Sequence, residues 1–127
     1  VLDPADELAI TRTFYPHGLG HLLGIQVHDI GGWQQNINGV ISAPPEQHPF
    51  LRLTRRLTEQ MVVTIEPGLY FIPLLLQQLK STPPGRHINW PLVDELTPWG
   101  GIRIEDNVCV TSAGTENYTR DAFNQLS

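Results

Sequence analysis

The apolar runs of this sequence are short, and proline and glycine residues separate them. The run MVVTIE (61–66) is rich in β-branched residues, so it predicts a strand that ends at Pro67-Gly68. LYFI (69–72) predicts a second extended segment, and PLLLQQLKS (73–81) predicts a short helix with proline in its first turn. No apolar run is long enough to cross a membrane.

Other short elements are predicted on both sides of this region. GIRIE (101–105) and NVCVTS (107–112) predict strands, and ADELAI (5–10) has helical character. Residues 31–49 are rich in Gly, Asn and Pro and predict a long irregular loop of the kind that often binds ligands, while residues 82–91 predict a further loop. The sequence therefore predicts an α+β fold, with a mainly antiparallel sheet and flanking helices.

The length, charge and cysteine content of the chain exclude several classes of function. The chain of 127 residues suits one domain. Its 8 basic and 13 acidic residues give a net charge of −5, which disfavours a nucleic-acid partner. Cys109 is the single cysteine, so an internal disulfide is excluded and a reducing, cytoplasmic location is expected. Neither a nucleic-acid nor a membrane partner is expected.

Histidines are concentrated in the stretch FYPHGLGHLLGIQVHD. His17, His21 and His28 lie close together in the sequence, and Gly18 and Gly20 lie between the first two. Imidazole is a common metal ligand and acid–base group, and glycine lets the backbone pass close to such a cluster. The alternative is structural, with polar histidines in a turn and His28 as a partly buried hydrogen-bond donor.

Charged residues are predicted at the ends of the strands. Glu66 ends the apolar run before a Pro-Gly turn. Along GIRIE, strand alternation places Arg103 and Glu105 on one face, and Ile102 and Ile104 on the other, core-facing side. Either glutamate could instead be a surface residue, with Glu105 paired to a nearby arginine.

Three motifs occur together in a fixed order: PHGLGHLLGIQVHD, TIEPGLYF and GGIRIEDN. Together they resemble the last three active-site motifs of the pita-bread metallopeptidases. HGLGH and the following VHD are most similar to the proline-specific branch. The segment NWPLVDELTPWGGIRIEDN resembles the bacterial Xaa-Pro dipeptidases (prolidases), a branch that includes organophosphorus acid anhydrolases. The resemblance implies the C-terminal half of a pita-bread (creatinase/aminopeptidase-like) fold.

The resemblance implies a metal site. His21 would be a metal ligand through an imidazole nitrogen, and Glu66 and Glu105 would be carboxylate ligands, with Glu105 bridging two ions. A mostly carboxylate site suits hard divalent cations, so two divalent ions are the expected cofactors, with manganese as the expected metal.

The resemblance also implies which residues act on the substrate, an Xaa-Pro dipeptide. His17 and His28 would lie on the substrate side, and Arg103 would hold the substrate or orient the ligands. A water activated by the two metals would attack the scissile carbonyl. Glu66 would take the proton from this water, and His28 would donate to the oxyanion or to the substrate carboxylate.

Two aspartate ligands of this family lie well upstream of the histidine motif. Asp3 and Asp6 are too close to His21 and lack the expected strand context. We therefore expect residues 1–127 to be the C-terminal portion of a metallopeptidase catalytic domain, without its N-terminal domain or the first half of the catalytic domain. This portion is expected to be inactive alone, and the full-length protein to be a homodimer. Alternative functions are a non-catalytic pita-bread binding module and organophosphorus ester hydrolysis at the same metal site.

Overall fold

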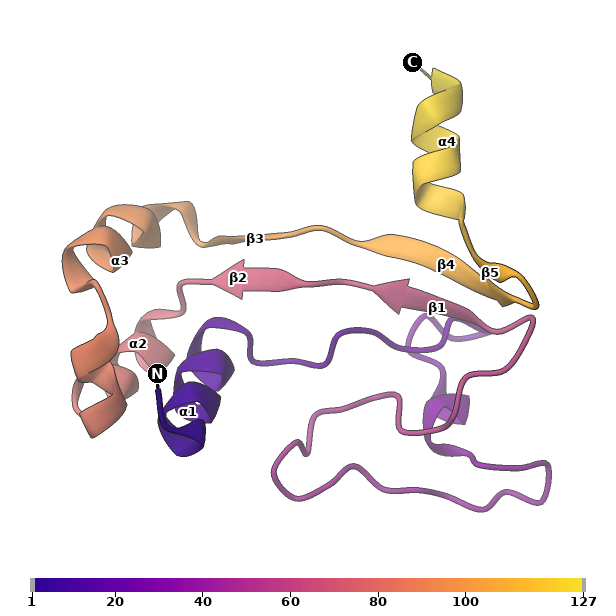
Figure 1. Cartoon of the computed structure of the whole chain (residues 1–127), viewed down its shortest axis with the longest axis horizontal. Helices are drawn as coiled ribbons and strands as arrows, with labels where there is room; N and C mark the ends of the chain where they lie inside the picture. The colour runs from indigo at the N-terminus through magenta and orange to yellow at the C-terminus, as the bar shows by residue number, and fades with distance from the viewer. Residues whose placement is uncertain (1, 127) are drawn as a thin grey trace. The chain divides into compact units, whose positions relative to one another are not determined.

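The computed structural model describes residues 2–126, which form short helices and antiparallel strands (Figure 1). Two compact units result, residues 2–17 with 68–103 and residues 18–67 with 104–126, and they are called the first and second unit below. In chain order the elements are α1 (Pro4–Phe14), η1 (Ile30–Trp33), β1 (Val62–Ile65), β2 (Gly68–Tyr70), α2 (Pro73–Lys80), η2 (Pro83–His87), α3 (Trp90–Leu96), η3 (Thr97–Trp99), β3 (Gly101–Arg103), β4 (Asp106–Thr111), β5 (Gly114–Asn117) and α4 (Tyr118–Leu126).

Helix α1 of the first unit begins where the sequence supplies a cap and a proline. The Asp3 carboxylate accepts hydrogen bonds from the backbone N–H of Ala5 at 2.7 Å and of Asp6 at 3.3 Å. Pro4 occupies the first turn, where no N–H partner is needed. The helical segment expected over residues 5–10 is therefore confirmed, and it continues to Phe14.

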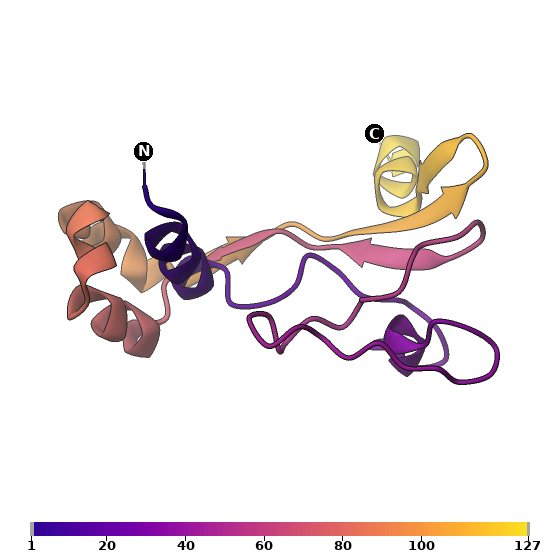
Figure 2. The same ribbon diagram turned by 60° about the horizontal axis from the view of Figure 1, so that its bottom comes forward.

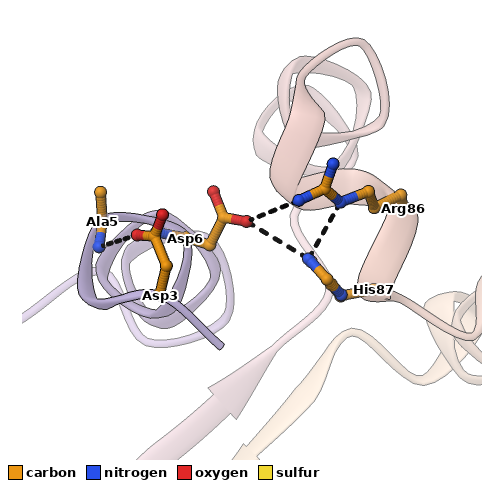
Figure 3. Close-up of polar contacts among 5 residues, drawn as sticks. All are labelled: Asp3, Ala5, Asp6, Arg86 and His87. Atoms are coloured by element: carbon orange, nitrogen blue, oxygen red, sulfur yellow. Dashed lines mark hydrogen bonds and ion pairs between the residues drawn. The ribbon is translucent and has the colours of Figure 1, made fainter. Parts of the chain in front are cut away.

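Polar side chains connect α1 to η2 within the first unit (Figure 3). Oδ2 of Asp6 lies 3.2 Å from Nε2 of His87 and 3.6 Å from Nη2 of Arg86. Nε of Arg86 also lies 3.1 Å from Nε2 of His87. The Arg86 side chain is 69% exposed, so this contact contributes little to the free energy of unfolding.

The core of the first unit lies between its helices and β2. Phe71, Leu76 and Val93 are buried there, with Phe14, Ile88, Trp90 and Leu96 packed around them. Strand β2 pairs antiparallel with β3, so that Gly68 lies opposite Arg103. The helix expected over residues 73–81 is confirmed as α2, which buries Leu76 and Leu79.

The expectation of a loop over residues 82–91 is wrong in part. Residues Pro83–His87 form η2, and α3 begins at Trp90. The side chain of Asn89 caps α3 by accepting a hydrogen bond from the Leu92 N–H at 3.3 Å. An Asn cap followed by Pro91 is a local helix-start signal, which the proline content of the segment obscured.

The second unit contains a three-stranded antiparallel sheet in the order β1-β4-β5. Val63 of β1 lies opposite Val108 of β4, and both are buried with Leu22. Leu53 and Met61 pack against this cluster. Strand β1 confirms the strand expected over residues 61–66, and the sheet confirms the expected antiparallel pairing.

The segment GIRIE is not one continuous strand. Strand β3 ends at Arg103 and pairs with β2, whereas β4 begins at Asp106 and pairs with β1. The side chains of Ile102 and Ile104 are 64% and 55% exposed. The expectation that these isoleucines face a core is therefore wrong for this chain: every residue of β3 is exposed, and Ile104 lies outside both strands.

The chain between η1 and β1 is irregular (Figure 2) and includes most of the loop expected over residues 31–49, whose first residues belong instead to η1. Hydrogen bonds hold this irregular segment. Nε1 of Trp33 donates to the Leu51 carbonyl at 2.9 Å, and Oγ1 of Thr54 donates to the Ser42 carbonyl at 2.6 Å. No helix within residues 2–126 is both long and apolar enough to cross a membrane.

Candidate metal centre

His21 lies alongside strand β1 of the second unit. Its carbonyl accepts a hydrogen bond from the Thr64 N–H at 2.9 Å, and the next residue, Leu22, forms a β-bridge with Val63. Gly20 passes so close to the strand that a Cβ atom there would overlap the Thr64 carbonyl oxygen. The glycine before His21 therefore allows the close approach that brings this histidine to the strand.

Two contacts orient the His21 ring, which is almost fully buried with 3% exposure of the residue. Nδ1 lies 3.0 Å from the Leu22 carbonyl oxygen, and Nε2 lies 3.2 Å from Oε1 of Glu66. Because a carbonyl oxygen only accepts hydrogen bonds, Nδ1 carries the proton in the first contact. In the neutral ring Nε2 then has a lone pair that points toward a carboxylate oxygen.

The two glutamates reach the same place from separate parts of the second unit. Glu66 follows the last residue of β1 and is 7% exposed, and its N–H donates to the Leu19 carbonyl at 2.8 Å. Glu105 precedes β4 and is exposed. One ligand atom from each of His21, Glu66 and Glu105 lies within 4.8 Å of the others, and no other such group occurs among residues 2–126.

These three residues fit a divalent cation. The lone pair of His21 Nε2 and the Glu66 carboxylate face each other at 3.2 Å, an arrangement that a shared proton or a cation stabilises. The Nδ1–H to carbonyl contact is the usual second contact of a metal-binding histidine. One imidazole nitrogen with two carboxylates suits divalent ions such as Mn²⁺ or Zn²⁺ better than a soft monovalent metal.

His28 lies beside this cluster in the second unit. Its ring centroid is 4.4 Å from that of His21, with the ring planes at 80°. Loss of hydration lowers the pKa of His28 below 6.5, and the charges of Arg52 and His21 lower this pKa further, while the two glutamates oppose the change. The site therefore favours a neutral His28 ring, which retains one N–H donor.

His17 and Arg103 belong to the first unit, whereas His21, Glu66 and Glu105 belong to the second unit. Nε2 of His17 lies 2.8 Å from the hydroxyl of Tyr70, and the His17 ring contacts the rings of Tyr15 and Tyr70 edge to face. Arg103 ends β3, opposite Gly68. The roles predicted for His17 and Arg103 remain predictions.

Three further residues were not identified from the sequence. Thr64 is hydrogen bonded to both His21 and Glu66, Arg52 supplies positive charge near His28, and Tyr70 contacts His17. Strand alternation in TIE could have placed Thr64 on the same face as Glu66. Arg52 lies in an irregular loop, so no local pattern signals its position.

The sequence of this chain is similar to a known family and to known proteins over most of its length. The profile of metallopeptidase family M24 matches residues 3–112. The Xaa-Pro dipeptidase of Actinobacillus pleuropneumoniae is 56% identical over 120 residues, which are 94% of this chain and 27% of that protein. The Xaa-Pro dipeptidase of Shewanella loihica is 57% identical over 115 residues, which are 91% of this chain and 26% of that protein. The chain thus spans about a quarter of the length of these relatives.

A solved structure also resembles this chain. Proline aminopeptidase P II from Yersinia pestis superposes with a TM-score of 0.52 at 30% sequence identity, over 95% of this chain and 21% of that protein. The similarity therefore extends over nearly the whole described chain and over a limited part of the larger protein.

Proposed function

The chain belongs to metallopeptidase family M24, and on that premise we propose that it forms part of an Xaa-Pro dipeptidase. Its α+β fold is that of part of a pita-bread metallopeptidase, as the three sequence motifs predicted. The substrate class is proposed from relatives named Xaa-Pro dipeptidase that are 54–57% identical to this chain.

We assign the activity to a protein of the relatives' length, because this chain spans about a quarter of that length. Residues 1–127 are proposed to supply the C-terminal portion of the catalytic domain. The observation that carries the proposal is the convergence of one imidazole and two carboxylates at the His21–Glu66–Glu105 cluster.

His21, Glu66 and Glu105 would hold divalent metal, for which we propose two manganese ions. When bound, divalent ions of this kind activate water near neutral pH and polarise a carbonyl oxygen. His21 and Glu66 are buried, and each side chain has a hydrogen-bond partner, so these two side chains are held in place before a ligand arrives.

The chain's own groups would then handle protons and substrate charge. Glu66 would accept a proton from the attacking water at a carboxylate oxygen. His28 would donate its N–H to the developing oxyanion or to the substrate carboxylate. The positive charge of Arg52 near His28 supports binding of that carboxylate, since an Xaa-Pro dipeptide has one at its C-terminal end.

His17 and Arg103 complete the proposal with the roles that the sequence motifs predict. His17 would lie on the substrate side, with the Tyr70 hydroxyl orienting its ring. Arg103 would hold the substrate or orient the metal ligands. A cytoplasmic homodimer acting on Xaa-Pro dipeptides, without nucleic-acid or membrane partners, is the form we propose for the whole protein.

The test is a chimera in which this chain replaces its matching segment in the Shewanella loihica relative. The chimera should hydrolyse Xaa-Pro dipeptides faster than matched Xaa-Ala dipeptides when Mn²⁺ is supplied. Glu66→Gln keeps the size of the side chain and should reduce turnover by about 100-fold or more. A chimera that folds and dimerises but hydrolyses neither dipeptide would favour a binding module, and activity confined to phosphotriesters would favour organophosphorus hydrolysis.

A further inference from the structure

Thr64 is the most deeply buried polar residue near the cluster, with 1% exposure. Its hydroxyl oxygen Oγ1 lies 3.0 Å from the His21 backbone nitrogen and 3.0 Å from Oε1 of Glu66. One hydroxyl group therefore contacts two of the three residues that converge at the candidate metal centre.

The chemistry of the partners fixes the direction of both hydrogen bonds. A backbone N–H only donates, so the contact with His21 uses a lone pair of the Thr64 oxygen. The hydroxyl hydrogen is then available for the Glu66 carboxylate, which accepts it. Both contacts form at once, because a hydroxyl has one hydrogen and two lone pairs.

We propose that Thr64 is a positioning residue, whose hydroxyl sets the placement of Glu66 relative to His21 so that both can bind one divalent metal ion. The inference rests on the proposed function, because it assumes that these two side chains are metal ligands. It adds a role for a residue that contacts the ligands and does not itself bind metal.

The hydroxyl is separable from the other contacts of Thr64. The Thr64 N–H donates to the His21 carbonyl at 2.9 Å, and this main-chain bond persists whatever the side chain. Thr64→Val keeps the branched shape and removes both hydroxyl contacts, whereas Thr64→Ser keeps the hydroxyl and removes a methyl group. The two variants therefore distinguish hydrogen bonding from packing.

Thr13 offers a matched control in the first unit. It is also buried, with 8% exposure, and its hydroxyl donates to the Ala9 carbonyl at 2.9 Å. Thr13→Val removes one buried hydroxyl contact without touching the cluster. A loss of metal affinity caused only by lower stability would appear in this variant as well.

The experiment is a Co²⁺ titration of the metal-free chimera with the Shewanella loihica relative, in which the bound ion is followed by its visible absorption. Thr64→Val should bind Co²⁺ about 10- to 100-fold more weakly than the unmodified chimera, with an altered absorption band, because loss of an outer contact to a ligand has that effect. Thr64→Ser should bind within about threefold of the unmodified chimera and keep its band, and Thr13→Val should do the same.

Equal affinity and an unchanged band in folded Thr64→Val would overturn the role of Thr64 and leave the proposed metal site intact. An unmodified chimera that folds but binds no Co²⁺ would instead contradict the metal site itself, and the inference would fail with it. Circular dichroism checks folding. If Thr64→Val does not fold, Thr64→Ala takes its place, and a tenfold loss in Thr64→Ser would by itself overturn the proposal.

Discussion

Nε2 of His21 lies 3.2 Å from Oε1 of Glu66, although the long loop and strand β1 separate the two residues in the sequence. Both are buried, and a single threonine hydroxyl contacts the backbone of one and the side chain of the other. This contact joins the histidine motif to the end of β1, and the consequences of changing it can be measured.

His21 and His28 should differ in their effect on bound metal. In the chimera with the Shewanella loihica relative, His21→Ala should lose metal and activity together, because it removes a ligand. His28→Ala should keep its metal content while turnover falls by about two to four orders of magnitude, the contribution of a positioned donor. Metal analysis and kinetics of the two purified variants test this. Metal loss from both variants would make His28 a ligand as well.

Arg52→Gln should raise the pKa of His28 toward 6.5. The Arg52 charge disfavours the protonated form of His28, so its removal makes protonation easier. A proton NMR titration of the metal-free chain measures the change. Arg56→Gln is the control, since Arg56 is an exposed arginine in the same loop and does not contribute to the pKa of His28. An unchanged His28 pKa in Arg52→Gln would show that the two side chains are farther apart in solution.

Asp106→Asn should make the chain less stable at neutral pH. Hydrogen bonds from Asn117 at 2.9 Å and from Arg120 at 3.0 Å lower the pKa of Asp106 below its usual 3.8. A carboxylate with a lowered pKa in the folded state stabilises it above the pKa of the unfolded chain, and this stabilisation is lost as the pH falls through the folded value.

Urea unfolding of both proteins between neutral and acidic pH measures this effect. The difference in the free energy of unfolding between the unmodified chain and Asp106→Asn should shrink as the pH falls below about 4. Glu116→Gln is the control, because it removes an exposed carboxylate from the neighbouring strand β5. A difference that stays constant with pH would mean that the charge of Asp106 has no role.

Gly20→Ala should lower the free energy of unfolding by about 3 kcal/mol, because the added Cβ overlaps the backbone carbonyl of Thr64 and cannot be relieved by a side-chain rotation. Gly39→Ala is the comparison. Gly39 has open space around it but a φ of +79°, so alanine there should cost about 1 kcal/mol from backbone strain alone. Thermal and urea unfolding test the order, and equal losses would contradict the close approach at Gly20.

Local signals in the sequence were sufficient for several elements. The helix-favouring run ADELAI lies within α1, and the β-branched run before Pro67 forms β1. Such signals act through the dihedral preferences and hydrogen bonds of neighbouring residues, so they can be read without knowing the fold. The motif order likewise identified the family and selected His21, Glu66 and Glu105 as candidate ligands.

Only the tertiary structure decided which distant groups meet. It ended the strand of GIRIE at Arg103 and left Ile102 exposed, and it brought Arg52 from an irregular loop to the vicinity of His28. It also placed the Thr64 hydroxyl between His21 and Glu66. These relationships depend on strand register and on the path of a long loop, which are set by packing between residues far apart in the chain, and short-range sequence patterns carry little information about such contacts.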